Sequence, residues 1–445
     1  MSPLSPQEHF HAIADHLGTR LRGDEVFTCT LDSEQSDFVR VNGARIRQAG
    51  TVTQHSLHVD WIRGRRHTGG ALTLAGDMAL DVGRIDSMVD DLRARLDEIP
   101  EDPHLLYATE VHSSERVVAS ELPAGEEAVA SILDCAGERD LVGVFASGGI
   151  YAGFASSLGQ RNWYANHSFN FDWSFHLRAD RAVKGSYAGT RFEPAEVASR
   201  FERAGEQLAV LEREPRIVLP GRYRVYLAPA ALYDILEMLA WGGFGLRAHR
   251  TRTTPLLELA EGKTALAPGV SIVENTAEGI APDFQRQGFI RPDRVSLVEG
   301  GHHADCLVSP RSAAEYGVPT NGADGGESPL SVEVGAGDLS RDDVLGELKS
   351  GIYISNLWYL NYSDRRACRT TGMTRFATFW VEGGRIEAPL GVMRFDESVY
   401  RLLGNNLVGL TRERETILDA DTYGHRSCKS ARLPGALVED FTFTL

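Results

Sequence analysis

The sequence has few cysteines and no long apolar run, and these two scarcities exclude several kinds of protein. Its five cysteines among 445 residues are scattered, odd in number and never in a CxxC pair. Neither a disulfide framework nor a zinc knuckle is therefore predicted. No run of about 18 apolar residues occurs, so no membrane-spanning helix is expected. The N-terminal segment MSPLSPQEHFHAIADH is polar throughout, unlike a signal peptide, and we expect a cytoplasmic protein.

Positive charge is also in deficit. Lys and Arg number 46 against 62 Asp and Glu, which leaves a formal net charge of −16. Nucleic acids and anionic membranes bind concentrated positive charge, so we expect neither as a partner. The hydrophobic share of 42% and the charged share of 24% are ordinary for a globular chain. The length suffices for two or three domains.

Predicted helices and strands alternate through the first 214 residues, as in an α+β domain with an antiparallel sheet. Amphipathic helices are expected over residues 5–18, 81–99, 123–136 and 193–211. Strands are expected at 26–31, 38–41, 44–47, 56–62, 141–146, 149–156 and 168–178. The Asn42-Gly43 pair favours a tight hairpin turn between two of these strands.

The strand at 168–178 has the clearest alternation in the chain. One face carries Phe169, Phe171, Trp173, Phe175 and Leu177, and the other face carries polar residues. Side chains of a strand point alternately to its two sides, so we expect the aromatic face to form domain core and the polar face to be wetter. A domain boundary is expected near 215–221, which gives an N-terminal domain of residues 1–214.

Residues 215–445 are predicted to form a mostly β C-terminal domain. Its strands are expected at 223–227, 270–273, 295–298, 302–307, 352–362, 375–381, 385–389 and 440–445. The first of these strands runs into Pro229, which suits the first turn of a helix. That helix carries an apolar stripe of Leu232, Ile235, Leu236 and Leu239. It is expected to end at Gly242-Gly243.

This strand and central helix resemble the central motif of the TldD/PmbA (TldD/TldE) family. In the TldD branch, the helix carries a zinc-binding His-Glu-x-x-x-His signature. Here the corresponding positions are Glu237, Met238 and Gly242, and no histidine lies between His176 and His249. The chain is therefore similar to the PmbA/TldE branch, which lacks the metal motif. The segments GIYISNLWYL and VSLVEGGHHADCLVSP also resemble family blocks in their order.

The resemblance implies a function for the chain as one subunit of a pair. Family members have two domains and associate through broad interfaces. The implied partner is a TldD-like subunit that carries zinc and the general base, and the implied activity of the pair is proteolysis or peptide processing. This chain would then be a non-catalytic, metal-free subunit of a metallopeptidase heterodimer that shapes the substrate chamber.

The residues of the central helix support no metal site of their own. Asp234 and Glu237 lie three residues apart and share a helix face, but no imidazole accompanies them. Met238 stands at the general-base position and cannot accept a proton. We therefore predict no metal ligand, no cofactor and no catalytic residue in this chain.

A polar stretch at 361–372 supplies candidates for binding a substrate or a partner. Arginines at three of five positions could hold a carboxylate through forked hydrogen bonds, although a structural ion-pair network is the alternative. The candidates come from this stretch, from the strand before it and from one histidine of another predicted strand. They are Tyr359, Asn361, Asp364, Arg365, Arg366, Arg369 and His302.

Two other functions remain open from the sequence. The chain could be a stand-alone homodimer that binds a peptide or metabolite without hydrolysing it. It could also be a hydrolase without zinc, using residues such as Cys428, with His425 nearby, or Asp364.

Overall fold

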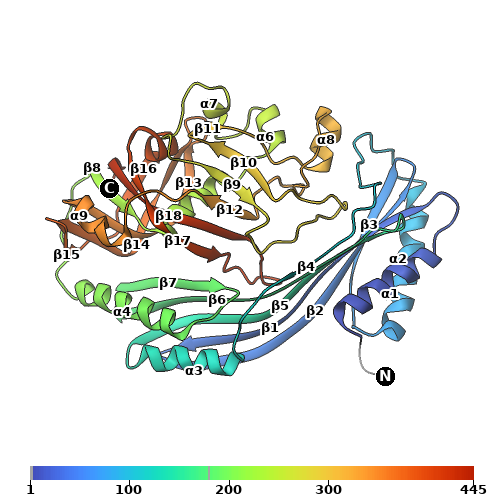
Figure 1. The fold of residues 1–445 in the computed structure, drawn as a ribbon, viewed down its shortest axis with the longest axis horizontal. Coiled ribbons are helices and arrows are strands. Elements are labelled where there is room, and N and C mark those ends of the chain that lie inside the picture. Colours follow the sequence, from blue (N-terminus) through green and yellow to red (C-terminus); the bar gives the residue numbers. More distant parts are fainter. Residues whose placement is uncertain (1–3, 179–180) are drawn as a thin grey trace.

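A computed structural model describes residues 4–178 and 181–445, and Figure 1 shows that these residues build two β-sheets. The first is a seven-stranded sheet in the order β3-β2-β1-β5-β6-β4, with β7 paired to β6. Its strands are β1 (Val26–Asn42), β2 (Arg45–Arg63), β3 (Arg66–Thr73), β4 (Ser114–Val118), β5 (Asp140–Ser156), β6 (Arg161–Arg178) and β7 (Arg181–Gly189).

Four helices cover this first sheet within the described part of the chain: α1 (Pro6–Thr19), α2 (Met78–Leu96), α3 (Gly125–Ala136) and α4 (Pro194–Leu211). In Figure 1, α3 and α4 lie along one end of the sheet and α1 and α2 along the other. The aromatic face of β6 packs under α4, where Phe201 lies 4.7 Å from both Trp173 and Phe175 between ring centroids. The prediction that this face forms core is confirmed.

The second sheet has eleven strands, in the order β11-β10-β9-β12-β18-β16-β14-β13-β8, with β15 on β14 and β17 on β18. Because β8 pairs with both β13 and β18, part of this sheet closes on itself. Its strands are β8 (Gly221–Leu227), β9 (Ile272–Asn275), β10 (Arg294–Glu299), β11 (His302–His303), β12 (Ser331–Val334), β13 (Gly351–Asp364), β14 (Arg369–Glu382), β15 (Arg385–Pro389), β16 (Arg394–Ser398), β17 (Leu407–Leu418) and β18 (Ser430–Phe443).

Short helices accompany the second sheet. They are α5 (Pro229–Ala240), α6 (Leu246–Arg250), α7 (Leu257–Ala260), α8 (Pro310–Tyr316) and α9 (Val344–Leu348), with a 3₁₀ turn at Arg341–Asp343 and a π turn at Arg401–Asn405. The two sheets with their helices confirm the predicted α+β fold class. Among the described residues, no helix has both the length and the apolar composition needed to cross a membrane.

Three predictions of strand boundaries were wrong in the first sheet. Residues 26–31 and 38–41 belong to one strand, β1, and the two strands expected around Gly148-Gly149 are one strand, β5. Glycine signalled a turn, but a Cβ on Gly148 would lie 2.2 Å from the Gln35 carbonyl, so glycine allows close pairing there. The hairpin turn lies one residue later than predicted, with Gly43 and Ala44 at positive φ.

Most of the polar stretch at 361–372 lies in two paired strands. Residues 361–364 complete β13 and residues 369–372 begin β14, so only 365–368 form the turn. Similarly, the strand expected at 302–307 is limited to His302–His303. Strand pairing across the sheet outweighed the local polarity of these segments.

Candidate functional site

The central helix α5 lies between β8 and a glycine-rich exit. Pro229 occupies its first turn, and Leu232, Ile235 and Leu239 are fully buried against the second sheet. The helix ends where Gly242 takes a φ of 76° and the amide of Gly243 donates to the Leu239 carbonyl. The predicted apolar stripe and helix end are confirmed.

The two acidic side chains of α5 are both occupied by this chain. The Leu357 amide of β13 donates to Asp234 Oδ2 over 3.0 Å, and burial raises the pKa of Asp234 to about 7 against the opposing effect of that bond and of Lys184. The Glu237 carboxylate forms an ion pair with the ammonium group of Lys429.

The residues on α5 do not fit a zinc ion. Zinc is bound in proteins by imidazole, thiolate or carboxylate groups, with at least three protein ligands. Glu237 already has a lysine ammonium as its cation. Met238 and Gly242 offer no such ligand, and the Met238 carbonyl accepts a hydrogen bond from the Tyr362 hydroxyl.

The segment that carries Lys429 also connects the two sheets. Arg426 is buried, and its guanidinium donates to the Ser168 carbonyl over 2.8 Å and to the Gly148 carbonyl over 3.3 Å. Its backbone amide donates to Glu34, which is 2% exposed on β1. Arg426 therefore contacts the first sheet while Lys429, three residues later, contacts α5 of the second.

Cys428 lies in the same segment and is not arranged as a nucleophile. Its thiol approaches the Asn166 amide at 3.9 Å, and burial raises the thiol pKa to about 11. The nearby His425 directs Nδ1 to the Arg426 carbonyl instead. A thiol of such high pKa is almost entirely protonated near neutral pH, so the structure disfavours a Cys428–His425 hydrolase.

Most of the polar candidates in the β13–β14 hairpin have structural partners. Arg365 donates to the carbonyls of Thr253 and Trp241 over 2.9 and 2.8 Å, and Arg369 forms a 3.0 Å ion pair with Asp396. The remaining contacts are local: Asp364 accepts the amides of Arg366 and Ala367, and Asn361 accepts the amide of Tyr362. The Arg366 side chain lines a shallow depression beside Thr253 and Leu257.

An exposed aromatic surface lies next to this hairpin. Tyr359 is 77% exposed with a φ of 58°, at an irregularity in the β13–β14 register between Trp358 and Asn361. Trp358 and Trp241 are about half and two-thirds exposed. Arg375 stacks on Trp358 at 4.8 Å, and Arg365 lies over Trp241 at 5.4 Å. We call Trp241, Trp358, Tyr359, Arg365 and Arg375 the aromatic–arginine surface.

The structure selects His303 rather than the predicted His302 as the histidine with chemical neighbours. His302 is exposed, whereas His303 points towards His249 and Cys306. Sequence reasoning did not group these three residues. The His-x-x-Cys spacing of 303–306 was the available signal, but His249 lies far away in sequence and nothing in its surroundings connected it to the pair.

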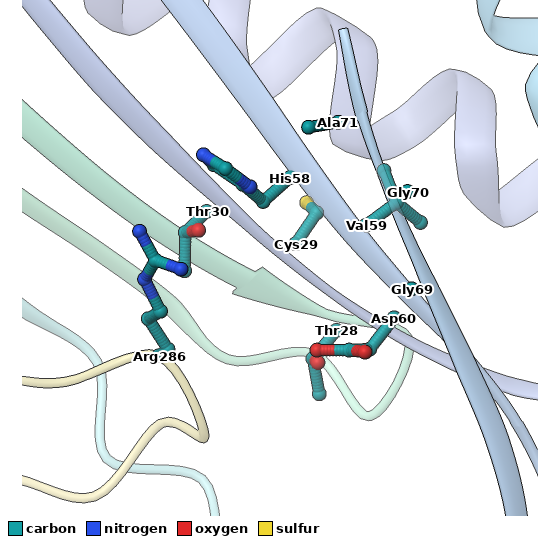
Figure 2. A pocket seen from close by; sticks show the side chains of 10 residues that line it. All are labelled: Thr28, Cys29, Thr30, His58, Val59, Asp60, Gly69, Gly70, Ala71 and Arg286. Carbon is teal, nitrogen blue, oxygen red and sulfur yellow. The ribbon is translucent and has the colours of Figure 1, made fainter. Parts of the chain in front are cut away.

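A separate depression of about 330 Å³ opens on the first sheet (Figure 2), where β1, β2 and β3 meet Arg286. His58 and Arg286 each lie near the Asp32 carboxylate, at 3.7 and 3.4 Å. Burial raises the pKa of Asp60 in its wall. Since His58 and Arg286 already lie against the Asp32 carboxylate, we do not take this depression as the candidate site.

Comparisons with known proteins identify the same architecture elsewhere. The family described as PmbA/TldA metallopeptidase C-terminal domain matches residues 220–445. No curated protein matches the chain. A solved structure of a candidate modulator of a DNA gyrase from Thermotoga maritima covers 98% of this chain and 100% of its own, with 14% identity and a TM-score of 0.77.

Two further structures have the same fold at equally low identity. TldE from Thermococcus kodakarensis has 14% identity and a TM-score of 0.76, and covers 98% of this chain and 100% of its own. A candidate modulator of DNA gyrase from Bacteroides thetaiotaomicron has 14% identity and a TM-score of 0.73, and covers 98% of both chains.

Proposed function

Since the chain belongs to the PmbA/TldA metallopeptidase family, we propose that it is a TldE-like subunit whose zinc-bearing, TldD-like partner hydrolyses peptides or peptide-like amides. In this proposal the partner supplies the catalytic zinc and the water-activating base. This chain supplies one wall of the substrate chamber and stabilises the partner. The pair would act in proteolysis or peptide processing in the cytoplasm.

The observation that carries the proposal is the ion pair between Glu237 and Lys429. A hydrolytic zinc site needs free ligands and an open coordination position for water. On α5, Glu237 is the carboxylate at a position of the zinc motif, and its counterion is the Lys429 ammonium group instead of a metal. Adding zinc there would require Lys429 to leave and new ligands to appear, so a companion chain is the better source of the metal.

The aromatic–arginine surface supports association with a partner. Trp, Tyr and Arg residues dominate the energetics of protein interfaces, and here Trp241, at the end of α5, and Trp358 and Tyr359, on β13, are about half exposed or more. Tyr359 holds a positive φ, which costs energy for a non-glycine residue and is typical of functional positions. A partner seated on this surface would lie next to the central helix.

Assembly is tested by purifying this chain with a TldD-like protein encoded beside its gene and measuring the mass of the complex by light scattering. We expect a heterodimer, and we expect the Trp358→Ser, Tyr359→Ser double variant to weaken it at least about tenfold. Tyr423→Ser is the matched control, because Tyr423 is an exposed tyrosine in the same half of the chain that lies outside the surface. A persistent homodimer in the presence of the partner would contradict the proposal and favour a stand-alone binding protein.

A further inference from the structure

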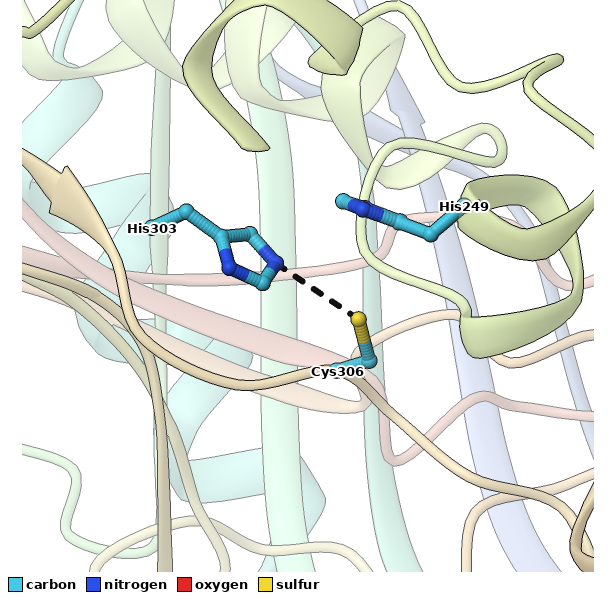
Figure 3. A group of neighbouring side chains, drawn as sticks. All are labelled: His249, His303 and Cys306. Atoms are coloured by element: carbon cyan, nitrogen blue, oxygen red, sulfur yellow. Dashed lines mark hydrogen bonds between the residues drawn. The ribbon is translucent and has the colours of Figure 1, made fainter. Parts of the chain in front are cut away.

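Three potential metal ligands meet just beyond the C-terminal end of α5. His249 comes from α6, His303 from β11 and Cys306 from the connection that follows β11. One ligand atom of each lies within 4.8 Å of the others, and His303 Nε2 is 3.5 Å from Cys306 Sγ. Figure 3 shows both imidazole rings and the thiol directed into one small space. We call these residues the His–His–Cys cluster.

Hydrogen bonds outside the cluster hold its members in place. His249 Nε2 lies 2.7 Å from the Gly243 carbonyl. A carbonyl only accepts, so Nε2 carries the proton and Nδ1 retains the lone pair that a metal binds. A backbone carbonyl behind an imidazole is the usual support of a metal-binding histidine.

The backbone around Cys306 is fixed in the same way. Asn321 donates to the Cys306 carbonyl over 2.8 Å and accepts the Val308 amide over 2.8 Å, while Asp305 accepts the Cys306 amide over 2.7 Å. The cysteine is therefore held by polar contacts on both sides of its residue. Such preorganisation lowers the cost of collecting ligands around an ion.

We infer that the His–His–Cys cluster binds one Zn²⁺ ion through two imidazole nitrogens and one thiolate, with a water molecule in the fourth position. Mixed imidazole and thiolate ligands select zinc over magnesium or calcium, which prefer oxygen. Three protein ligands in a tetrahedral site leave one position open. The two histidines are half-buried, so solvent has access to that position.

The observed spacings are close to those that zinc needs. With metal–nitrogen distances of about 2.0 Å and a metal–sulfur distance of about 2.3 Å, tetrahedral ligands lie roughly 3.3 to 3.6 Å apart. The His303–Cys306 pair is already at 3.5 Å, and the widest separation in the cluster, at most 4.8 Å, must close by about 1 Å. Small side-chain rotations suffice for that adjustment.

The charges around the cluster also suit a cation. The carboxylates of Asp305 and Glu327 lie near Cys306 and favour a cation there, and the Arg250 guanidinium, which is also nearby, lies over the Tyr316 ring. Among the described residues, no lysine or arginine hydrogen-bonds to the three cluster side chains, in contrast to Glu237 on α5.

This site is separate from the central helix and independent of the proposed function. Its ligands follow α5 in the chain, and the α5 face with Glu237 and Lys429 contributes none of them. A zinc ion here would join α6 to the β10–β11 hairpin. The proposal concerns this chain alone, so its test needs no partner subunit.

The test is metal binding by the purified full-length chain. We expect about one Zn²⁺ per chain by plasma mass spectrometry after dialysis against buffer, a value that follows from one three-ligand site. Replacement by Co²⁺ should give a thiolate-to-cobalt charge-transfer band. Cys306→Ser should abolish that band, and His249→Ala should weaken Zn²⁺ binding at least about tenfold, because it removes one of three ligands.

Matched controls separate loss of ligands from loss of fold. His302→Ala removes the neighbouring exposed histidine and Cys135→Ser removes a cysteine of α3, and both should retain the metal and the band. Circular dichroism checks each variant, and His303→Ala replaces any variant that does not fold. An apo chain that takes up no Zn²⁺ or Co²⁺, or a cobalt spectrum unchanged by Cys306→Ser, would overturn the inference.

Discussion

The acidic face of α5 and the His–His–Cys cluster beyond the C-terminal end of that helix differ in the cation that each can hold. On α5 the protein provides its own cation, the Lys429 ammonium, for the Glu237 carboxylate. In the cluster, two imidazoles and a thiol face one another, and among the described residues no ammonium or guanidinium group hydrogen-bonds to them. The Glu237 carboxylate therefore already has its counterion, whereas the cluster offers three groups whose lone pairs could bind a metal.

The difference shows that family membership alone does not locate a metal. The position expected from the zinc-bearing branch is closed by residues of this chain, while a group of ligands appears where the sequence resemblance gave no reason to look. The following substitutions test the contacts around α5 and the segment that carries Lys429. Each should change the stability of the chain and leave its metal content unchanged.

The largest effect is expected from Arg426→Met. The change leaves the Glu34 carboxylate buried without its nearby positive charge and leaves two buried carbonyls without a donor. Breaking a buried charged network typically costs about 3–5 kcal/mol. The free energy of unfolding in urea measures this loss. Arg432→Met is the control, since Arg432 is half-exposed and 3.9 Å from Glu278, and it should cost less than about 1 kcal/mol.

Asp234→Asn should change how stability depends on pH. The folded-state pKa of Asp234, about 7, lies above its unfolded value of 3.8. The folded protein therefore binds the proton more tightly, and wild-type stability falls as pH rises from about 4 to 7. The asparagine variant should lack this fall and gain roughly 2–4 kcal/mol relative to wild type at pH 8. Parallel pH profiles for the two proteins would contradict the raised pKa.

Arg365→Met should destabilise the end of α5, whereas Arg366→Met should not. Arg365 donates to two backbone carbonyls and stacks on Trp241 and Tyr362, which together support the helix exit. Charged hydrogen bonds of this kind are worth about 1.5–3 kcal/mol. Because Arg365 is only partly buried, we expect a loss at the lower end of that range, read as a shift in the urea midpoint. Equal losses in both variants would contradict the structural role of Arg365.

The smallest effect is the coupling between Glu237 and Lys429. Both side chains are partly exposed, so their ion pair is screened by solvent. A double-mutant cycle with Glu237→Gln and Lys429→Met should give a coupling of about 0.5–1 kcal/mol that weakens in high salt. A coupling near zero would mean that the pair does not hold the face closed. The observation carrying the proposed function would then be lost.

Much of the fold could be predicted because its elements have strong local patterns. The apolar residues of α5 and the aromatic residues of β6 each follow a regular spacing. That spacing places them on one face of the element, so the sequence identifies the buried face. The middle of β1 could not be recognised, because Glu34 and Ser36 look like loop residues and are buried in contact with Arg426 and the neighbouring strands. Part of their burial comes from a segment almost 400 residues away.

The candidate site was predicted less well for the same reason. The arginines at 365 and 369 suggested anion binding, but their partners, the Trp241 carbonyl and Asp396, are brought to them by the sheet and the end of α5. The His–His–Cys cluster is assembled from α6 and β11, which no local pattern connects. Contacts between segments far apart in sequence therefore determined which polar residues make structural bonds and which remain available to bind a ligand.

The most direct test of the central claim is peptide hydrolysis by the reconstituted pair with one change in each subunit. We predict that the mixture is active, that Glu237→Gln in this chain leaves most of the activity, and that alanine at a zinc ligand of the TldD-like partner abolishes it. Hydrolysis by this chain alone, lost in the Glu237→Gln variant, would contradict the account.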